Sequence, residues 1–188
     1  MIIYIHGYGS SGLSDKARHY EKLFADQGFI APTLSAESRL AMHTLEGLVA
    51  SFLKHEPVGL IGSSLGGFFA IYLAQRYAVP AVLINPAIPP WDQDLNAQTV
   101  NDSGRFQWQT EQLSRLAAFR VSNADEALQK RLLLLQQLAD EVLDPQLALD
   151  YLPQAQQIVE AGGNHRFSGI ERHDQTVREF FNRALVLK

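Results

Sequence analysis

The sequence predicts an α/β domain with a mainly parallel sheet. Short apolar segments alternate along the chain with longer segments whose apolar residues recur at helical spacing. Hydrophobic residues make up 46% of the 188 positions, and a chain of this length can bury about 70% of the surface that it exposes when unfolded. We therefore expect one domain over residues 1–188, built around one sizeable core.

The elements follow from the period of the apolar residues. The last helix, for example, is expected from Ile170, Val177, Phe180, Phe181 and Leu185, which leave an apolar stripe at helical spacing. Pro145 stands where a helix tolerates proline, in the first turn. The expected strands cover residues 2–5, 29–32, 58–61, 81–84, 131–135 and 157–159. The expected helices cover residues 13–27, 40–55, 65–77, 124–129, 145–152 and 170–187.

One interval, residues 86–123, interrupts this alternation. It shows no strand pattern, and a connection of this length usually has a function or carries its own helices. We expect a helical cap insertion here, before the strand at 131–135. Its aromatic residues can belong to the core of extra helices, to a cap over a pocket, or to both. They are Trp91, Phe106, Trp108 and Phe119.

Charge and composition argue against several classes of partner. The net charge of −4 lacks the basic surplus of a nucleic-acid binder, so we expect no nucleic-acid partner. The chain has no cysteine, which excludes disulfides and thiol catalysis. The apolar run at residues 2–5 is too short for a signal peptide or a membrane span. We expect a cytoplasmic protein without a membrane partner, while the oligomeric state stays open.

The first glycine-rich turn permits two interpretations. Gly7, Gly9 and Gly12 spell G-x-G-x-x-G after an apolar strand, which is the fingerprint of a dinucleotide-binding unit. Glu37 lies near the spacing expected of a ribose-binding acid. However, His6 precedes the first glycine, and His-Gly after a strand is typical of a different chemistry. The dinucleotide interpretation also leaves the second glycine-rich turn unexplained, so it is the less favoured one.

The second glycine-rich turn predicts a nucleophilic serine. Residues 62–66 read Gly-Ser-Ser-Leu-Gly, a G-x-S-x-G sequence between an apolar strand and an apolar helix. This arrangement is the nucleophile elbow, in which a strained turn lifts the serine to the edge of the sheet. Gly62 and Gly66 provide the space that such a turn requires, and Ser64 is the expected nucleophile. Ser63 occupies the wrong position and is expected to pack.

A nucleophilic serine needs a base and an orienting acid, which follow it in the chain in this fold. Two histidines follow Ser64, and His165 lies directly after an expected strand. His173 falls in the last helix, where we expect a solvated side chain. Asp140 is the expected acid, because it follows the strand before that of His165.

Two other carboxylates lie near Asp140. Asp144 is the alternative acid, and Glu141 is expected to be solvated. Asp140 could also be a simple loop or capping carboxylate.

The same elbow suggests which groups would stabilise an oxyanion. In such sites one backbone N–H comes from the residue after the nucleophile and another from the loop after the first strand. Here those residues are Leu65 and Tyr8. Gly7 and Gly9 would let the backbone approach the reacting carbonyl closely. His6 is expected to be a hydrogen-bonded structural residue at the base of the loop.

With these residues identified, the chain resembles the α/β-hydrolase superfamily, and more narrowly the small YqiA/YcfP-like esterase family. The resemblance runs nearly end to end through YIHGYGSS, GLIGSSLGGFFAIYLA, LINPA, QQLADEVLD and EAGGNHRFSGIE. It implies an α/β-hydrolase fold with about six strands, and Ser64, Asp140 and His165 as nucleophile, acid and base. Ala139 departs from the glycine expected beside the acid. Residues 91–123 match weakly, which leaves substrate preference open.

The expected activity is hydrolysis of a carboxylic ester through a serine acyl-enzyme, acting on a small-molecule ester or thioester. No metal or organic cofactor is expected. A thioesterase or acyltransferase could use the same three residues. A binding scaffold that has kept the fold without activity is the other alternative, because a fold alone does not give a function.

Overall fold

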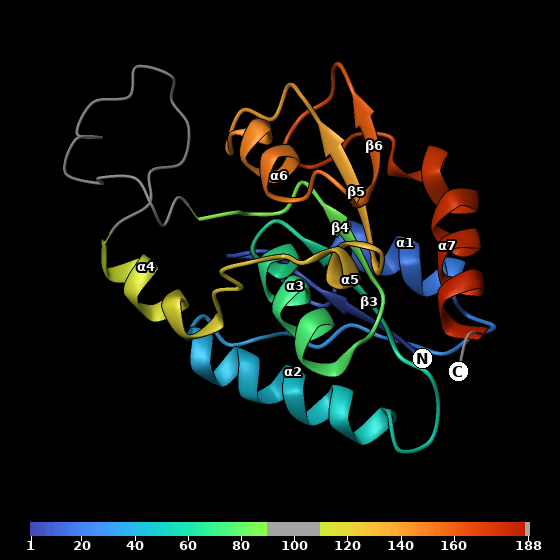
Figure 1. Cartoon of the computed structure of the whole chain (residues 1–188). Coiled ribbons are helices and arrows are strands. Elements are labelled where there is room, and N and C mark those ends of the chain that lie inside the picture. Colours follow the sequence, from blue (N-terminus) through green and yellow to red (C-terminus); the bar gives the residue numbers. More distant parts are fainter. Residues whose placement is uncertain (90–109, 187–188) are drawn as a thin grey trace.

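Six parallel strands form one sheet in the order β2-β1-β3-β4-β5-β6. The computed structural model describes residues 1–89 and 110–186 (Figure 1). Neighbours in the sheet that are not neighbours in the chain are joined by crossover connections, as parallel pairing requires. The strands are β1 (Ile2–Ile5), β2 (Phe29–Ile30), β3 (Gly59–Ser63), β4 (Ala81–Ile84), β5 (Leu132–Gln137) and β6 (Gln156–Glu160).

Helices cover both faces of the sheet. Figure 1 shows α2 and α3 on one side and α1 and α7 on the other. The α-helices are α1 (Asp15–Leu23), α2 (Ser38–Phe52), α3 (Leu65–Tyr77), α4 (Thr110–Leu116), α5 (Glu126–Gln129), α6 (Pro145–Tyr151) and α7 (Asp174–Val186). The short 3-10 helices are η2 (Ala117–Phe119) and η3 (Ile170–His173).

The alternation of side chains along each strand divides the core into two clusters. On β1, Ile3 and Ile5 pack with α2 and α3, while Ile2 and Tyr4 pack with α1 and α7. Buried on both faces, β1 and β4 are apolar throughout rather than alternating, as is typical of parallel sheets. Both clusters together hold the carboxyl ends of β1, β3, β4 and β5 at one edge of the sheet.

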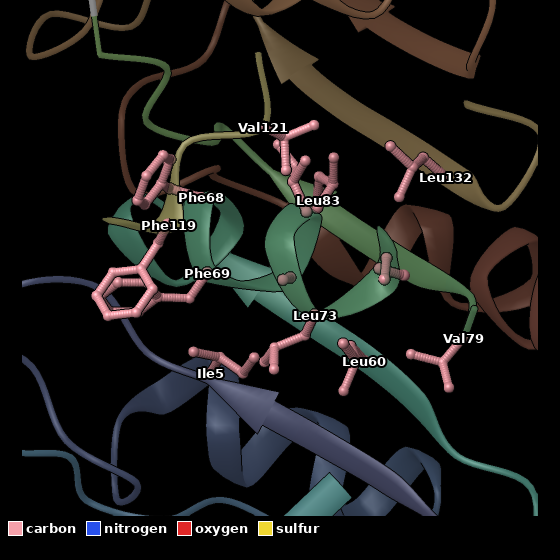
Figure 2. Close-up of a cluster of buried hydrophobic side chains, with 14 of the residues drawn as sticks. Ile5, Leu60, Phe68, Phe69, Leu73, Val79, Leu83, Phe119, Val121 and Leu132 are labelled. Carbon is pink, nitrogen blue, oxygen red and sulfur yellow. The ribbon is translucent and has the colours of Figure 1, made fainter. Parts of the chain in front are cut away.

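The cluster on the α3 side includes residues from the predicted insertion. Figure 2 shows Phe119 beside Phe69 of α3, and their rings meet edge to face with centroids 6.0 Å apart. Phe119 is buried, and Val121 packs in the same cluster. The other aromatic residues named for this interval, Trp91, Phe106 and Trp108, lie outside the described residues.

The predicted α/β class and the mainly parallel sheet of about six strands are confirmed, while several boundaries differ. The first helix is shorter than expected, because Ser14 caps its start by accepting from the Ala17 N–H and the backbone leaves helical geometry at Phe24, with a φ of −109° and a ψ of 22°. The fifth strand is longer than expected. It continues through Gln136 and Gln137, whose polarity concealed that they are buried. Across residues 1–89 and 110–186, no helix combines the length and the apolar character that crossing a membrane would require.

Candidate active site

The turn between β3 and α3 holds Ser64 in a strained backbone conformation. Its φ of 55° and ψ of −122° lie in a region that residues with a side chain seldom adopt. The Ser64 N–H donates to the Ile84 carbonyl, and the Ala87 N–H donates to the Ser64 carbonyl. These two bonds tie the turn to the end of β4, which offsets the strain. The predicted elbow geometry is therefore present in the structure.

Three glycines make room for this turn. A Cβ atom on Gly62 would lie 2.3 Å from the Gly66 carbonyl oxygen, and one on Gly66 would lie 2.0 Å from the Ile5 carbonyl oxygen. No side chain fits either position. A Cβ atom on Gly7 would lie 3.0 Å from Ser64 Cβ, so the first loop passes directly beside the serine. Gly9 has a φ of 67° and turns that loop away.

The structure brings Ser64, His165 and Asp140 into one hydrogen-bonded chain. His165 Nε2 lies 3.0 Å from Ser64 Oγ, and His165 Nδ1 lies 2.8 Å from Asp140 Oδ2. The tautomer with the proton on Nδ1 satisfies both contacts, because that nitrogen then donates to Asp140 and Nε2 accepts from the serine hydroxyl. Asp140 is 2% exposed and His165 is half-buried, so the Asp140 carboxylate contacts the imidazole of His165 away from solvent.

The two candidate acids occupy different environments. Asp140 Oδ1 accepts from the backbone N–H groups of Val142 and Leu143, each at 2.9 Å, while Oδ2 faces His165. Asp144 caps α6 by accepting from the Gln146 N–H. The turn at Ala139 forms without glycine, and the Ala139 N–H donates to the Gly162 carbonyl. Asp140 thus lies where the sequence places an orienting acid, and Asp144 starts a helix.

Glu141 is exposed, as expected, and its Oε2 also accepts from the His165 N–H at 2.9 Å, so that it holds the loop that carries the histidine. The expectation of a solvated His173 is wrong. Its Nε2 lies 2.9 Å from Glu160 Oε1, and its ring meets Phe167 edge to face. The helical pattern around His173 could not reveal these partners, because both lie on the preceding strand and loop.

A buried amide network behind His165 was missed in the sequence. Asn85 Nδ2 donates to the carbonyls of Asn164 and His165, at 2.9 and 3.2 Å. Asn85 Oδ1 accepts from the Gln137 N–H and from Gln136 Nε2. One side chain therefore joins the ends of β4 and β5 to the histidine loop. Polar residues at the carboxyl ends of apolar strands were the available signal.

Gln137 extends this network to β6. Its Oε1 accepts from the Asn164 N–H at 2.9 Å, and its Nε2 donates to Glu160 Oε2 and to the Ser168 carbonyl. A Cβ atom on Gly163 would lie 2.0 Å from the Gln137 side chain, so glycine is what allows the amide to reach the loop. The buried side-chain amides of Asn85 and Gln137 therefore hold the loop that carries His165.

Glu160 is the charged end of the network. Desolvation by itself raises the pKa of this carboxyl, but hydrogen bonds from Gln137, Arg172 and His173 outweigh it and lower the pKa to about 2. Arg172 bonds both carboxylate oxygens at 2.9 Å. Glu160 therefore stays ionised near neutral pH and holds η3 against β6.

The loop after β1 lies against the elbow. His6 is buried and structural, as expected, with Nδ1 donating to the Gly7 carbonyl and Nε2 accepting from the Leu34 N–H. Tyr8 follows in the loop, and its side chain is exposed. Leu65 is the first residue of α3, whose first-turn N–H groups have no intrahelical acceptor. Tyr8 and Leu65 border the same cavity as Ser64.

Two cavities meet at Ser64 and His165. The first, of about 410 Å³, is bordered largely by apolar side chains that include Leu65, Leu116 and Val142. The second, of about 660 Å³, is mostly polar and runs between the first loop, α1 and the segment after His165. Tyr8 borders both cavities. The helix α4 contributes Leu116 and Arg115 to the first, so the described end of the predicted insertion borders the same cavity as Ser64.

The carboxylate of Glu37 is not left free for a ribose, as the dinucleotide interpretation requires. Instead it caps α2 by accepting from the N–H groups of Arg39 and Leu40. Within residues 1–89 and 110–186, histidine and carboxylate side chains form no group of three that could hold a metal ion.

Comparisons with known proteins identify a family for this chain. The family model described as "Uncharacterised protein family (UPF0227)" matches residues 1–182. The UPF0227 protein YcfP of Salmonella arizonae is 25% identical over 187 residues, covering 96% of this chain and 98% of the relative. The resemblance to YcfP-like proteins stated from the sequence is thereby confirmed.

Solved structures show the fold. Alpha/beta hydrolase domain-containing protein 10 from mouse superimposes with a TM-score of 0.70 at 22% identity, covering 97% of this chain and 89% of that one. The Pyrococcus furiosus esterase PF2001 superimposes with a TM-score of 0.71 at 17% identity, covering 98% and 81%. At these identities the likeness concerns architecture. The chain belongs to the UPF0227 family and has the α/β-hydrolase fold.

Proposed function

We propose that this protein is a serine hydrolase that cleaves carboxylic esters of small molecules through an acyl-enzyme on Ser64. The observation that carries the proposal is the unbroken chain from Ser64 Oγ through His165 to Asp140, at distances of 3.0 and 2.8 Å. A serine hydroxyl is a weak nucleophile until an adjacent base accepts its proton. His165 supplies that base. Two cavities meet at Ser64 and His165 and would give a substrate access to the serine.

His165 moves the proton in both halves of the proposed reaction. In the first, Nε2 takes the Ser64 proton as Oγ bonds to the ester carbonyl carbon. The tetrahedral intermediate then collapses, the carbon–oxygen bond to the alcohol breaks, and the alcohol leaves with the proton from Nε2. In the second, Nε2 takes a proton from water, the hydroxide attacks the acyl carbon, and Ser64 recovers its proton as the acid departs.

Asp140 orients the imidazole and stabilises its charged form in this proposal. With Oδ1 held by two backbone N–H groups, the carboxylate cannot turn away from His165. The Nδ1–H contact selects the tautomer that leaves Nε2 free to accept. Glu141, Asn85 and Gln137 would act through the loop rather than on the substrate.

The N–H groups of Tyr8 and Leu65 would stabilise the oxyanion. Leu65 begins α3, and the positive end of the helix dipole favours negative charge at that point. Removing one donor from an oxyanion hole typically lowers kcat by about 100- to 1,000-fold. Because both donors belong to the backbone, side-chain substitutions at these two positions would leave that contribution in place.

A fluorophosphonate probe tests the proposal directly, because it labels only a serine that is activated as a nucleophile. We expect one adduct, located on Ser64 by peptide mass spectrometry, and none on Ser64→Ala. Ser63→Ala is the matched control, since Ser63 is the buried residue directly before Ser64, at the end of β3. Folded protein that takes up no adduct, or takes it up elsewhere, would contradict the proposal and favour a binding scaffold.

Substrate pairs then separate the related enzyme classes. Matched oxygen esters and thioesters, with and without an added alcohol acceptor, are compared by the release of acid and the formation of a new ester. Preferential hydrolysis of oxygen esters supports the esterase proposal. Faster thioester cleavage would indicate a thioesterase, and a new ester would indicate an acyltransferase.

A further inference from the structure

We propose that the substrate carries an anionic group, a carboxylate or a phosphate, which Lys16 and Arg166 bind in the second cavity. The inference rests on the proposed hydrolysis at Ser64 and adds the class of substrate. The cavity of about 660 Å³ is bordered by Ser64 and His165 at one end and by Lys16 and Arg166 along its wall. An anion held there would be part of the molecule that reacts with Ser64.

Two elements bring the cations together. Lys16 lies in the first turn of α1, and Arg166 directly follows His165. Their charges act on each other across the cavity. Arg166 is exposed at the rim and Lys16 is half-buried. Both cations therefore border the same cavity as the candidate nucleophile.

Neither cation is neutralised by the part of the chain that the structure describes. Over residues 1–89 and 110–186, Lys16 and Arg166 have no hydrogen bond or ion pair, whereas Arg18 and Arg172 pair with Asp15 and Glu160. His19, which also borders the cavity, pairs with Asp174. Glu171 also borders it, so one carboxylate without an ion pair stands against two cations along the described wall.

The energetics of Lys16 favour an anion as its partner. Burial is the main cause that lowers the pKa of its ammonium, Arg166 lowers it further, and Asp15 raises it. A bound anion would offset both unfavourable effects, because it replaces lost hydration and screens the two cations from each other. A carboxylate or a phosphate can accept from both groups at once.

The first cavity indicates the chemical character of the rest of the substrate. Leu65, Leu116 and Leu143 make that side apolar, and its cation Arg115 already pairs with Glu111 at 2.6 Å. A molecule that spans the serine would therefore place an apolar group in the first cavity and an anion in the second. The anion can belong to the acyl group or to the leaving group, and both arrangements are tested.

The experiment compares anionic esters with neutral ones of the same shape. In one arm the acyl group carries the charge, with 4-nitrophenyl hemisuccinate against its methyl ester. In the other arm the leaving group carries it, with the butyrate ester of glycerol phosphate against glycerol monobutyrate. The ratio of kcat/KM values, anionic over neutral, is measured for the wild-type protein and for Lys16→Met and Arg166→Gln.

We expect the wild type to prefer the anionic member of at least one pair, and each substitution to lower that preference by about tenfold, as for a partly exposed hydrogen bond between charged groups. Added salt should weaken the preference, because these charges are in contact with solvent. Lys16→Arg should restore most of it. Lys22→Met is the matched control, since it removes a charge from the exposed end of the same helix, away from the cavity.

The outcomes separate this inference from the proposal on which it rests. The anion site would be overturned if the ratio of kcat/KM values, anionic over neutral, were the same in the wild type, Lys16→Met and Arg166→Gln. If Ser64→Ala still abolished hydrolysis of the neutral esters, the esterase proposal would stand. Hydrolysis that persists in Ser64→Ala would overturn both. An equal loss in Lys22→Met would show that general charge, rather than this cavity, sets the preference, which also overturns the site.

Discussion

Asp140 and Asp144 lie close together in the chain but in different environments. Asp140 bonds two backbone N–H groups and the candidate base, whereas Asp144 begins a helix. Sequence order alone favours Asp140 without excluding Asp144. What separates them is the turn at 140–143, which aims one carboxylate at His165.

Substituting Asp140→Asn should reduce kcat severely. An amide can turn its NH₂ group toward Nδ1, which would place the imidazole proton on Nε2. A protonated Nε2 cannot accept the proton of Ser64. We expect a loss of about 10³- to 10⁴-fold with little change in KM, measured by steady-state ester hydrolysis.

Asp144→Asn serves as the control for that experiment. Asparagine is also a good N-cap residue, so we expect nearly unchanged stability and activity. If Asp144→Asn lost activity and Asp140→Asn did not, the orienting acid would be Asp144.

Asn85 is the residue whose contribution we expect to be most visible in kcat alone. Its φ of 40° suits glycine, so Asn85→Gly removes the amide without adding backbone strain. The carbonyls of Asn164 and His165 then lose their donor, and the histidine is held less firmly. We expect kcat to fall by about 10- to 100-fold at nearly constant KM, in line with the cost of misplacing a catalytic group. A proportional rise in KM instead would indicate a role in binding substrate.

These residues show what a sequence can and cannot reveal about a site. Ser64 and His165 were predicted because a local motif and chain order constrain them. Asn85, Gln136 and Gln137 were not predicted, because each acts through partners on another strand or loop. In the sequence, only their position at the carboxyl ends of apolar strands distinguishes these amides from surface amides.

At the scale of elements, the strands and helices were predictable where apolar periodicity is strong. The bounds of β1 and β4 match the expected ranges, since both are fully buried. The end of β5 was placed too early because Gln136 and Gln137 are polar, although they bond inside the protein. Helix ends depend on individual caps such as Ser14, which periodicity does not capture.

The junction of β6 and η3 should make stability depend on pH in the acid range. The pKa of Glu160 is about 2 in the folded protein against an ordinary value of 4.5. A lowered folded-state pKa stabilises the protein above the unfolded-state value, and that contribution is lost as pH falls from about 4.5 to about 2. We expect about 2 kcal/mol of the free energy of unfolding to disappear across this range.

Urea denaturation at a series of pH values measures this loss. Glu160→Gln should be less stable at neutral pH and show a flatter decline below pH 4.5. Glu21→Gln, at an exposed position on α1, should follow the wild-type curve. Identical acid profiles for Glu160→Gln and the wild type would contradict the role given to this carboxylate.

At the scale of the whole molecule, the sheet joins two apolar clusters that meet at the central strands. Leu83 on β4 is fully buried beside α3 (Figure 2). Leu83→Ala should lower the free energy of unfolding by about 2–5 kcal/mol, because it removes buried methyl groups and leaves a cavity. Calorimetry or urea denaturation measures this, with the exposed Leu13→Ala as a control that we expect to change little.

The architecture as a whole was predictable because it follows from repetition. Alternating strands and helices limit the sheet to parallel crossovers, and parallel strands gather their carboxyl ends at one edge. The order of the strands and the two cavities could not be read in advance, since they arise from contacts between distant segments.

The strained turn at Ser64 sets stability against activity at a single position. Glycine would adopt the φ of 55° without the steric cost that any other side chain bears there. Ser64→Gly should therefore melt at a higher temperature than Ser64→Ala, although both lack the hydroxyl. A hydrolase of this design would keep at its centre a residue that selection for stability alone would replace.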